Sequence, residues 1–440
     1  MNLRLAFYGD DFTGSTDALE ALELAGIRAR LFLHPPSPSE LAGFPGLEAA
    51  GVAGGSRTFT PTEMDAHLPA IFEALAALGA PLIHYKVCST FDSSPTSGSI
   101  GRAIEIGRAV TGARPAAILA GAPALGRYCA FGHLFARAGA ARPVHRIDRH
   151  PTMSRHPVTP MDESDLRLHL ARQTPLRCAL LDLLDLELDD DALDARLDEI
   201  IAGGEEMILF DVLRGGHLPR LGRLFDRLSR RHAPLFIAGS SGVEAALAAY
   251  WQSLPGGPRP PAWPAPAPVH QMLVVSGSCS PVTDRQIQWL LDHGGIEVPL
   301  DAAALTSDAA ARVFEQSVSQ VLELLEQGAT PVVHTCRGPG DPRLAPGAGA
   351  AISLWLGRLL RAVLDRRRPP RTAILGGDTS VAAGTALAIR SLTLLTPIDP
   401  GAPLCLAHGG PVADGLEIIF KGGQLGREDF LGRAQGQQPR

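Results

Sequence analysis

The first half of the chain alternates short apolar runs with amphipathic segments. Apolar runs with the length of strands occur at 3–9, 27–33, 82–89, 116–121, 144–148, 178–183, 206–212 and 234–239. Apolar residues at helical spacing mark segments between these runs, for example 16–26, 190–202 and 217–230. Strands that alternate with helices are typical of a parallel sheet covered on both faces, so this half predicts an α/β domain.

A proline-rich stretch at 251–271 separates this pattern from a second one. Proline at this density favours an extended linker. Beyond it the pattern predicts strand 272–277, helix 282–293, strand 331–336, helix 349–367, strand 372–376, helix 380–390 and a β-hairpin at 404–421. We therefore expect two α/β domains with mainly parallel sheets flanked by helices: an N-terminal domain at 1–250, the linker at 251–271 and a C-terminal domain at 272–440.

Composition narrows the class of protein. The chain has 440 residues, 45% of them hydrophobic, and a net charge of −6, which gives no electrostatic reason to bind nucleic acid or an anionic membrane. None of the six cysteines forms a CxxC pair, so neither a zinc site nor a disulfide framework is indicated. No apolar run has the roughly 18–20 residues of a membrane helix, and the N-terminus lacks a signal-peptide core. We expect a cytoplasmic protein.

Two loops after predicted strands carry candidate chemistry in the first domain. Asp10 and Asp11 follow the first strand and can act as a base, bind a hydroxyl or ligate Mg²⁺. The alternative is that Asp11 caps the next helix, which accounts for one carboxylate but not for the pair. The loop after strand 82–89 combines Lys86 with Ser and Thr hydroxyls, a combination that suits a polyhydroxylated anion, although an ordinary polar turn is the alternative.

The lysines are themselves informative. Of the 40 basic residues, 38 are Arg and only Lys86 and Lys421 are Lys. A coding bias toward Arg explains most positions, but a retained Lys can indicate a site that needs a compact ammonium rather than a planar fork. Arg57, in Gly-Gly-Ser-Arg, is a candidate carboxylate clamp with a surface role as its alternative. Cys88 is more readily a packing residue than a nucleophile.

Histidines and arginines also cluster at 145–150 and 154–160. Their spacing fits no usual metal-ligand pattern, so an anion-facing loop and a solvated surface loop both remain open. His133 can bind a hydroxyl or simply satisfy the core.

Three glycine-rich turns mark the second domain, at 276–280, 376–380 and 421–426. Such turns direct backbone N–H groups at an anion, so together they favour a phosphate site. Neither lysine stands in a Walker A context, no GxGxxG follows the first strand, and the protein-kinase motifs are missing. A nucleotide site in this chain must therefore be of a less common type.

The order of these motifs resembles the four-carbon acid sugar kinase family over essentially the whole chain. The segments that carry the resemblance are GDDFTGSTDALE, YKVCSTFDSS with GSIG, FGHLF, RHPVTPMDESDL, AGSSGVE, VVSGSCSPVTDRQI, LGGDTSVAAG and FKGGQLG. The resemblance implies an N-terminal acid-sugar domain, a C-terminal ATP domain and an active site in the cleft between them. It also implies transfer of the γ-phosphate of ATP, with Mg²⁺, to a terminal hydroxyl of a short sugar acid.

Carried over by position, the resemblance implies specific site residues. Those of the substrate site are Asp10, Asp11, Arg57, Lys86, Cys88 and Ser89, with the Asp pair catalytic. Those of the nucleotide site are Ser276, Gly376, Gly377, Asp378, Thr379 and Gly423. Lys421 is added to the nucleotide site because of its own glycine-rich turn. The expected partners are an acid sugar and ATP, without nucleic acid or membrane, and a homodimer stays open.

Departures from the family pattern bear on the substrate. Cys88 stands where many members have Asp, and the CSTFDS text resembles the branch that acts on 3-oxo acid sugars. GSIG, where GNIG is usual in that branch, leaves 3-oxo-tetronate and 3-oxo-isoapionate both open. In the closing motif, Gly422-Gly423-Gln424-Leu425 stands where KSGNF is common in the family. This departure affects which contacts to the nucleotide can be carried over from the family. A kinase for threonate or erythronate, a non-catalytic sensor, and a ligase or NAD-linked enzyme are the alternatives.

Overall fold

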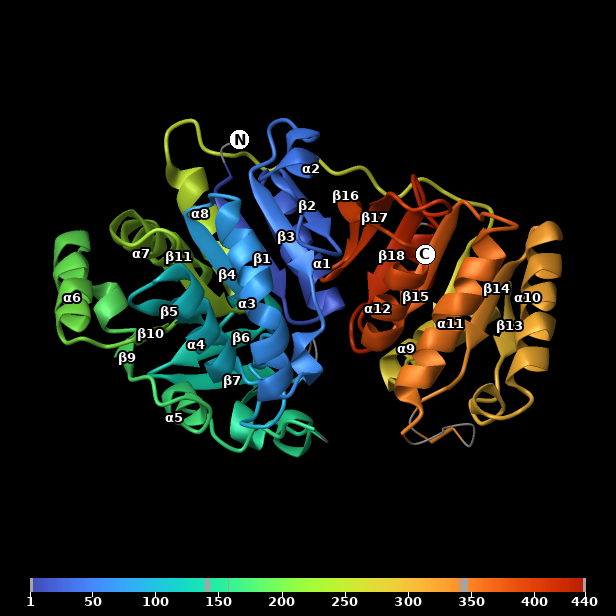
Figure 1. Cartoon of the computed structure of the whole chain (residues 1–440), viewed down its shortest axis with the longest axis horizontal. Coiled ribbons are helices and arrows are strands. Elements are labelled where there is room, and N and C mark those ends of the chain that lie inside the picture. Colours follow the sequence, from blue (N-terminus) through green and yellow to red (C-terminus); the bar gives the residue numbers. More distant parts are fainter. Residues whose placement is uncertain (1–2, 139–142, 157, 339, 342–346, 438–440) are drawn as a thin grey trace. The chain divides into compact units, whose positions relative to one another are not determined.

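The computed structural model describes residues 3–138, 143–156, 158–338, 340–341 and 347–437. Two compact units divide the chain: unit 1 comprises Met1–Ala29 and Pro35–Pro261, and unit 2 comprises Arg30–His34 and Ala262–Arg440 (Figure 1). Each unit is an α/β structure with a mainly parallel sheet, which confirms the predicted fold class. The domain boundaries expected from the sequence stay a prediction.

Unit 1 is built on a parallel sheet of buried strands. Their order is β3 (Ala49–Ala53), β1 (Leu5–Gly9), β4 (Leu82–Lys86), β11 (Leu235–Gly239), β5 (Ala116–Leu119), β10 (Met207–Phe210) and β9 (Cys178–Leu181). Continuous apolar runs form these strands because helices cover both faces of a parallel sheet. The sequence pattern predicts all of these strands except β3. Its sequence, rich in Ala and containing Gly, is not hydrophobic enough to stand out as a strand.

Helices flank this sheet in two groups (Figure 1). On one side α3 (Pro61–Ala77) packs against α4 (Ile100–Thr111). On the other, α8 (Gly242–Ser253) packs against both α1 (Phe12–Leu24) and α7 (Leu218–Arg231). The helices connect parallel strands of one sheet and therefore cover its faces. The remaining helices of the unit are α2 (Pro38–Ala42), α5 (Leu166–Ala171) and α6 (Asp190–Ala202).

The first helix begins earlier than the pattern predicts. α1 starts at Phe12, whereas the spacing of apolar residues places its start at 16. Asp11 is its N-cap, and its side chain accepts a hydrogen bond from the backbone N–H of Gly14 at 2.9 Å. A carboxylate at this position satisfies a free N–H group and faces the positive end of the helix. The first turn of α1 contains polar Thr and Ser residues, so the spacing of apolar residues does not indicate that the helix begins there.

A small antiparallel sheet stands apart from the parallel one. It consists of β6 (Arg127–Ala130), β7 (His133–Arg137) and β8 (Val144–Arg146). The run at 144–148, predicted among the alternating strands, therefore belongs to a different sheet, and its three-residue strand is mostly exposed. A bridge between Cys129 and Val212, just after β10, attaches this sheet to the carboxyl edge of the main one.

Unit 2 contains a mixed sheet. Its order is β13 (Gly295–Pro299), β14 (Thr330–His334), β12 (Leu273–Ser276), β15 (Arg371–Leu375), β18 (Glu417–Lys421), β17 (Ala402–His408), β16 (Ser391–Asp399) and β2 (Ala29–Phe32). The first five strands in this order, β13, β14, β12, β15 and β18, are parallel to one another. The pairs β18–β17, β17–β16 and β16–β2 are antiparallel. The predicted hairpin at 404–421 corresponds to β17 and β18.

One strand of unit 2 comes from the first half of the sequence. Residues Arg30–His34 belong to unit 2, where Leu31 and Phe32 pair with β16. Arg30 Nε donates a 2.8 Å hydrogen bond to Ser391 Oγ in the same place. An apolar run alone cannot reveal which sheet a strand will join, so this placement is a finding of the structure.

Helices also cover the sheet of unit 2 (Figure 1). α11 (Gly349–Leu364) packs against α10 (Ala310–Glu326) and α12 (Gly377–Ala386), while α9 (Pro281–Asp292) packs against α13 (Phe430–Ala434). The apolar pattern did not predict β13, β16 or α10. In the described part of the chain, no helix is both long and apolar enough to cross a lipid bilayer.

Candidate active site

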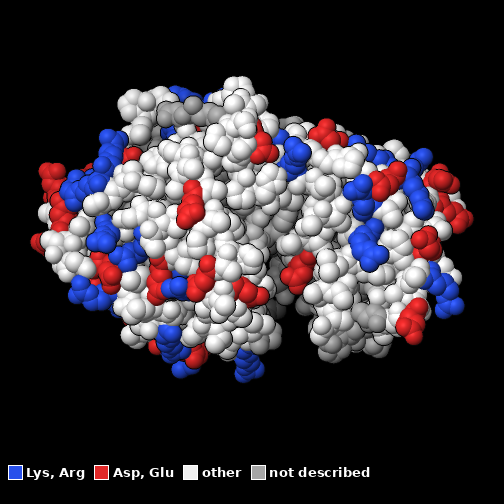
Figure 2. Space-filling model, viewed as in Figure 1, with Lys and Arg blue, Asp and Glu red and all other residues white. Residues whose placement is uncertain are grey.

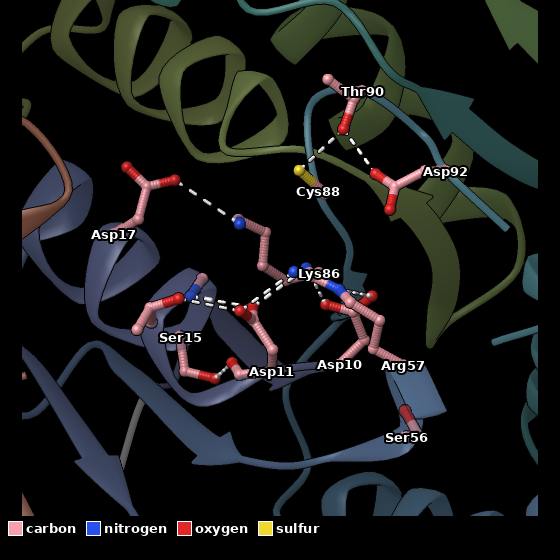
Figure 3. Close-up of polar contacts among 12 residues, drawn as sticks. Asp10, Asp11, Ser15, Asp17, Ser56, Arg57, Lys86, Cys88, Thr90 and Asp92 are labelled. Carbon is pink, nitrogen blue, oxygen red and sulfur yellow. Dashed lines mark hydrogen bonds and ion pairs between the residues drawn. The ribbon is translucent and has the colours of Figure 1, made fainter. Parts of the chain in front are cut away.

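The carboxyl edge of the unit 1 sheet brings distant polar residues together. Asp10 and Asp11 follow β1, Lys86 ends β4, and Arg57 lies in the short 3₁₀ helix Ser56–Thr58 beyond β3. β1 pairs with both β3 and β4, and Gly9 lies opposite Lys86 in the register. Ligands bind at this edge of open α/β sheets because the loops that enter the helices meet there. The cluster is therefore a candidate substrate site (Figure 3).

Arg57 joins the two carboxylates (Figure 3). Its Nε and Nη2 donate to Asp10 at 3.2 and 2.8 Å, and its Nη1 and Nη2 donate to Asp11, both at 3.0 Å. These bonds use four of the five N–H donors of the guanidinium, so one N–H on Nη1 is left for a ligand. Arg57 therefore holds the Asp pair in place, and its capacity to clamp a substrate carboxylate is limited to a single bond in this arrangement.

The two neighbouring carboxylates differ in their contacts. Asp11 accepts four hydrogen bonds: two from Arg57, one from the backbone N–H of Gly14, and one from Thr13 Oγ1 at 2.8 Å. These fill the roughly four acceptor positions of a carboxylate. Within the described part of the chain, the carboxylate of Asp10 accepts two bonds, both from Arg57. Asp10 therefore retains acceptor positions for a substrate hydroxyl.

Their protonation differs as well. Burial raises the pKa of Asp10 from its ordinary 3.8 to about 6, although the charge of Arg57 opposes this shift. Burial also favours the neutral form of Asp11, but the charges of Arg57 and Lys86 outweigh it and lower the pKa of Asp11 below its usual range. Asp10 is the better proton acceptor near neutral pH, because a catalytic base works best with a pKa close to the working pH.

Lys86 is buried beside the Asp pair. Its Nζ lies 3.5 Å from Asp17 Oδ2, on the first turns of α1. Burial alone would lower the pKa of Lys86, but Asp17, Asp11 and Asp10 together raise it above its ordinary value, so the ammonium stays charged. A Cβ at Gly14 would lie 2.9 Å from Lys86 Nζ and 2.4 Å from Asp11 Oδ1, so only glycine lets the helix start approach this closely.

Cys88 and Ser89 follow Lys86 in the loop after β4 and are half-buried. Thr90 Oγ1 donates to Cys88 Sγ at 2.9 Å and also contacts Asp92 (Figure 3). Burial raises the pKa of the Cys88 thiol, so it remains protonated at neutral pH. Cys88 therefore carries a neutral thiol beside the cluster. It is not a thiolate nucleophile, because a thiolate at neutral pH needs a lowered pKa.

Other polar residues of unit 1 were singled out by their sequence. His133 Nδ1 lies 2.9 Å from Ser164 Oγ, and Arg146 forms two 2.7 Å hydrogen bonds with Asp148. Both are internal contacts of the small sheet and its loops. Arg146 thus has a partner within its own segment, whereas Thr159 of the second segment donates to Asp92 in the loop after β4 at 3.4 Å. Residue 157 of the second segment lies outside the described residues.

Sequence reasoning missed two residues of this region. Asp17 escaped because it lies inside the helix, although its position six residues after Asp11 puts it near the first turn. Arg127, on β6, has a buried Nε without a hydrogen-bond partner among the described residues, and burial lowers the pKa of its guanidinium although Cys88 opposes this shift. Nothing in the sequence around Arg127 indicates that its Nε is buried, because burial depends on how β6 packs in the folded chain.

Unit 2 contains a pocket of about 270 Å³ at the carboxyl edge of its own sheet. Its walls come from the loops after β12, β14, β15 and β18 and from the start of α11. The lining residues are Gly277, Ser278, Cys279, Ala302, Thr335, Cys336, Gly349, Ile352, Ser353, Gly376, Gly377, Asp378, Thr379 and Gly423. The three glycine-rich turns singled out in the sequence therefore meet at one cavity.

The pocket is suited to an anion. α12 begins at Gly377, so the free N–H groups of its first turn face the cavity wall formed by residues 376–379. Gly376 has a φ of 119°, which favours glycine, and a Cβ at Gly423 would lie 2.5 Å from Ser278 Oγ. The glycines thus keep the space open and the backbone accessible. Asp378 supplies a carboxylate at the same wall.

Two residues expected at the nucleotide site are not among those that line the pocket. Ser276 is fully buried and accepts a 3.3 Å hydrogen bond from the backbone N–H of Ser278. Lys421 is also buried; its Nζ donates to the carbonyl oxygens of Gly422 at 2.8 Å and Leu425 at 3.0 Å. Burial lowers the pKa of Lys421 to about 7. Here the ammonium holds the closing loop in shape.

The charges outside these sites are dispersed. Basic and acidic side chains are interspersed on the face shown in Figure 2, in line with the modest net charge of −6. Among the described residues, no group of three or more His, Cys, Asp or Glu side chains is placed to hold a metal ion. A Mg²⁺ ion bound through nucleotide phosphates needs only one or two protein carboxylates, and Asp378 fits that requirement.

Comparison with known proteins identifies the class of protein. One family model, described as a sugar-binding N-terminal domain, matches residues 5–247, and another, described as a nucleotide-binding C-terminal domain, matches residues 273–431. A 3-oxo-isoapionate kinase from Paraburkholderia graminis is 44% identical, with 98% of this chain and 93% of that protein covered. A 3-oxo-tetronate kinase from Pseudomonas fluorescens is 30% identical, with 98% and 96% covered.

These matches define a kinase of small sugar acids with one sugar-binding and one nucleotide-binding domain. The chain belongs to the four-carbon acid sugar kinase family, which confirms the resemblance seen in the motifs. A solved structure from Salmonella typhimurium LT2 has a TM-score of 0.80 at 25% identity and covers 98% of both chains. A second one, from Haemophilus influenzae, has a TM-score of 0.73 at 22% identity, covers 98% of this chain and 99% of its own, and supports the fold alone.

Proposed function

We propose that this protein is an ATP-dependent kinase that phosphorylates the terminal hydroxyl of a short 3-oxo acid sugar. The observation that carries the proposal is the cluster of Asp10, Asp11, Arg57 and Lys86 at the sheet edge of unit 1, which combines a base with two cations. Between the two substrates left open by the sequence, 3-oxo-isoapionate is favoured, because the kinase named for it is 44% identical and the 3-oxo-tetronate kinase 30%.

In this proposal, Lys86 is the main partner of the substrate carboxylate. It is the charged group of the cluster with the most unused donors, since its three N–H bonds meet a single ion pair at 3.5 Å. The remaining N–H of Arg57 adds one further bond. Cys88 and Ser89 shape the wall next to the sugar. A neutral thiol at position 88 leaves room for a keto group, whereas a carboxylate there would repel the oxygens of the substrate.

Asp10 is proposed as the general base. It has free acceptor positions and a pKa raised to about 6, so above that pH it can accept the proton of the attacking hydroxyl. Asp11 is proposed as the positioning group. It caps α1, and with its fully used carboxylate it fixes Arg57, which in turn orients Asp10. The Asp pair expected to be catalytic from the sequence therefore divides into a base and its support.

The pocket of unit 2 is proposed to bind ATP. Its glycine-rich turns and the start of α12 offer backbone N–H groups to the phosphates, and Asp378 is the carboxylate that would hold Mg²⁺. When bound, Mg²⁺ neutralises charge that develops on the transferred phosphoryl group. Ser276 and Lys421 support the loops of this pocket from beneath, through their bonds to Ser278, Gly422 and Leu425.

The test is release of ADP by the purified chain with a panel of sugar acids. We expect turnover with 3-oxo-isoapionate to exceed that with 3-oxo-tetronate, and both to exceed that with threonate and erythronate. Mass and NMR spectra of the product should show one phosphate on a terminal carbon. Binding of a sugar acid without any ADP release would instead indicate a sensor, and a nicotinamide-dependent absorbance change would indicate a dehydrogenase. Either result would refute the proposal.

A further inference from the structure

Two cysteines are neighbours in the wall of the pocket of unit 2. Cys279 lies in the loop after β12 and Cys336 in the loop after β14, and both line the cavity. β12 and β14 are neighbouring parallel strands, with Ser276 opposite His334 in the register. The two cysteines therefore follow this pair by three and two residues. Neighbouring strands lie about 4.8 Å apart, and disulfides span Cα separations of about 4.4–6.8 Å.

The two thiols have different surroundings. Cys279 is exposed, whereas Cys336 is 2% exposed and donates a 2.9 Å hydrogen bond to the carbonyl oxygen of Gly338. The thiols also interact with each other: burial raises the pKa of Cys336 to about 12, and contact with Cys279 contributes to that shift. A solvent-accessible cysteine beside a second, resolving cysteine is common in redox-sensor proteins, and Cys279 has this exposure and this neighbour.

The other cysteines lie elsewhere in the fold. Cys88, Cys129 and Cys178 belong to unit 1, and Cys405 is buried on β17. The descriptions of the two matching family models mention no redox function. The proposed phosphoryl transfer makes no use of Cys279 or Cys336. The pair thus consists of two neighbouring thiols in the wall of a pocket, and the proposed phosphoryl transfer does not explain their proximity.

We propose that Cys279 and Cys336 form a reversible disulfide when the protein meets a peroxide, and that this bond closes the pocket of unit 2. The sulfur of Cys279 attacks the O–O bond, becomes a sulfenic acid and releases one water. The sulfur of Cys336 then attacks the sulfenic sulfur, and the hydroxyl group leaves with the Cys336 proton as a second water. Two thiols are oxidised and one peroxide is reduced. A dithiol reductant reverses the reaction.

The disulfide would act on nucleotide binding by occupying space. It fixes the β12 and β14 loops to each other at the wall of a cavity of about 270 Å³, beside Ser278 and Thr335. The bond itself is independent of the function proposed above, whereas its effect on nucleotide binding rests on that function. The two can therefore fail separately, and the experiment is chosen to tell them apart.

The experiment treats the purified full chain with hydrogen peroxide and counts thiols after denaturation. The chain has six cysteines, so the count should fall from six to four and return to six after reduction. Peptide mapping should show one cross-link, between Cys279 and Cys336. Titration calorimetry should show ADP binding at least about tenfold weaker after oxidation, a change of about 1.4 kcal/mol or more.

Variants and protection complete the design. Cys279→Ser and Cys336→Ser should each abolish the cross-link, whereas Cys178→Ser, in unit 1, should form it as the wild type does. Saturating ADP should slow cross-linking, because it covers the exposed sulfur. A thiol count that stays at six, or a cross-link between other cysteines, would overturn the inference. Cross-linking that proceeds equally fast with saturating ADP would support the disulfide and count against the nucleotide site.

Discussion

Replacement of Asp10 by Asn tests the proposed mechanism most directly. The change keeps the size of the side chain and an oxygen that can still accept from Arg57, but removes the ability to take up a proton. Loss of a general base costs about 10²–10⁴-fold in rate, so we expect kcat to fall by that factor. Asp11→Asn serves as the matched comparison, because it removes an identical charge from the neighbouring position.

The pH dependence of kcat/KM supplies the more specific readout. In the wild type, Asp10 is protonated below its pKa of about 6 and ionised above it, so the rate should rise with pH through 6 and then level off. Asp10→Asn should lose this limb along with most of the rate. Asp11→Asn should be slower, because its amide nitrogen cannot accept the hydrogen bonds from Arg57 Nη1 and Thr13 Oγ1. Its remaining oxygen can still cap α1, so the variant should keep a limb near the same pH.

A stability measurement separates loss of the base from unfolding. The pKa of Asp10 is higher in the folded protein than in the unfolded chain, so its ionised form costs stability, by about 3 kcal/mol for the shift from 3.8 to about 6. This unfavourable contribution appears as pH rises through the folded pKa and is absent below 3.8. At pH 8, Asp10→Asn should therefore be at least as stable as the wild type in thermal denaturation. A variant that keeps its pH limb or loses less than tenfold in kcat would refute Asp10 as the base.

Three further predictions concern other charged and glycine positions. Lys86→Met should raise KM for the acid sugar by about 10- to 100-fold, the effect of one lost charge-assisted hydrogen bond. The affinity for ADP, measured by calorimetry, should stay unchanged. An unchanged KM would show that Lys86 does not bind the substrate. Gly377→Val should weaken ATP binding by about tenfold or more with little change in Tm, because its Cβ meets open space in the pocket rather than protein atoms; normal affinity would exclude phosphates from that wall. Lys421 has a pKa lowered to about 7 in the folded state against 10.5 when unfolded, so its contribution to stability should grow as pH rises from 7 toward 10 in denaturant melts. Lys421→Met should lose that increase, and a variant that keeps it would show that the lysine is not desolvated.

Much of the fold follows from local pattern. Continuous apolar runs mark β1, β4, β5, β10 and β11, because a strand covered on both faces needs apolar residues at every position. The strands and helices that the pattern missed have weaker signals for a physical reason. β3 is made of Ala, Gly and Val, and β13 is largely exposed, so neither differs much in hydropathy from a loop. The start of α1 was missed because polar capping residues precede its apolar face.

The candidate sites were predicted less evenly. The glycine-rich turns and the Asp–Asp pair are contiguous in sequence, and the chemistry of glycine and carboxylate marks them without a structure. Asp17 has no such signal in the sequence, because it matters only through Lys86, a neighbour far away in the sequence. The same holds for Cys279 and Cys336, which are 57 positions apart yet line one cavity.

The amino-acid sequence by itself determines the α/β character of the two domains. It also determines which chemical groups are present: three glycine-rich turns suited to phosphate, an Asp pair and only two lysines. Tertiary structure decides which of these groups meet and in what state. Pairing of β1 with β3 and β4 delivers Arg57 and Lys86 to the Asp pair, and burial then separates two adjacent carboxylates into one with a raised and one with a lowered pKa. Such differences depend on distance and solvent access, which are properties of the folded chain and not of residue order.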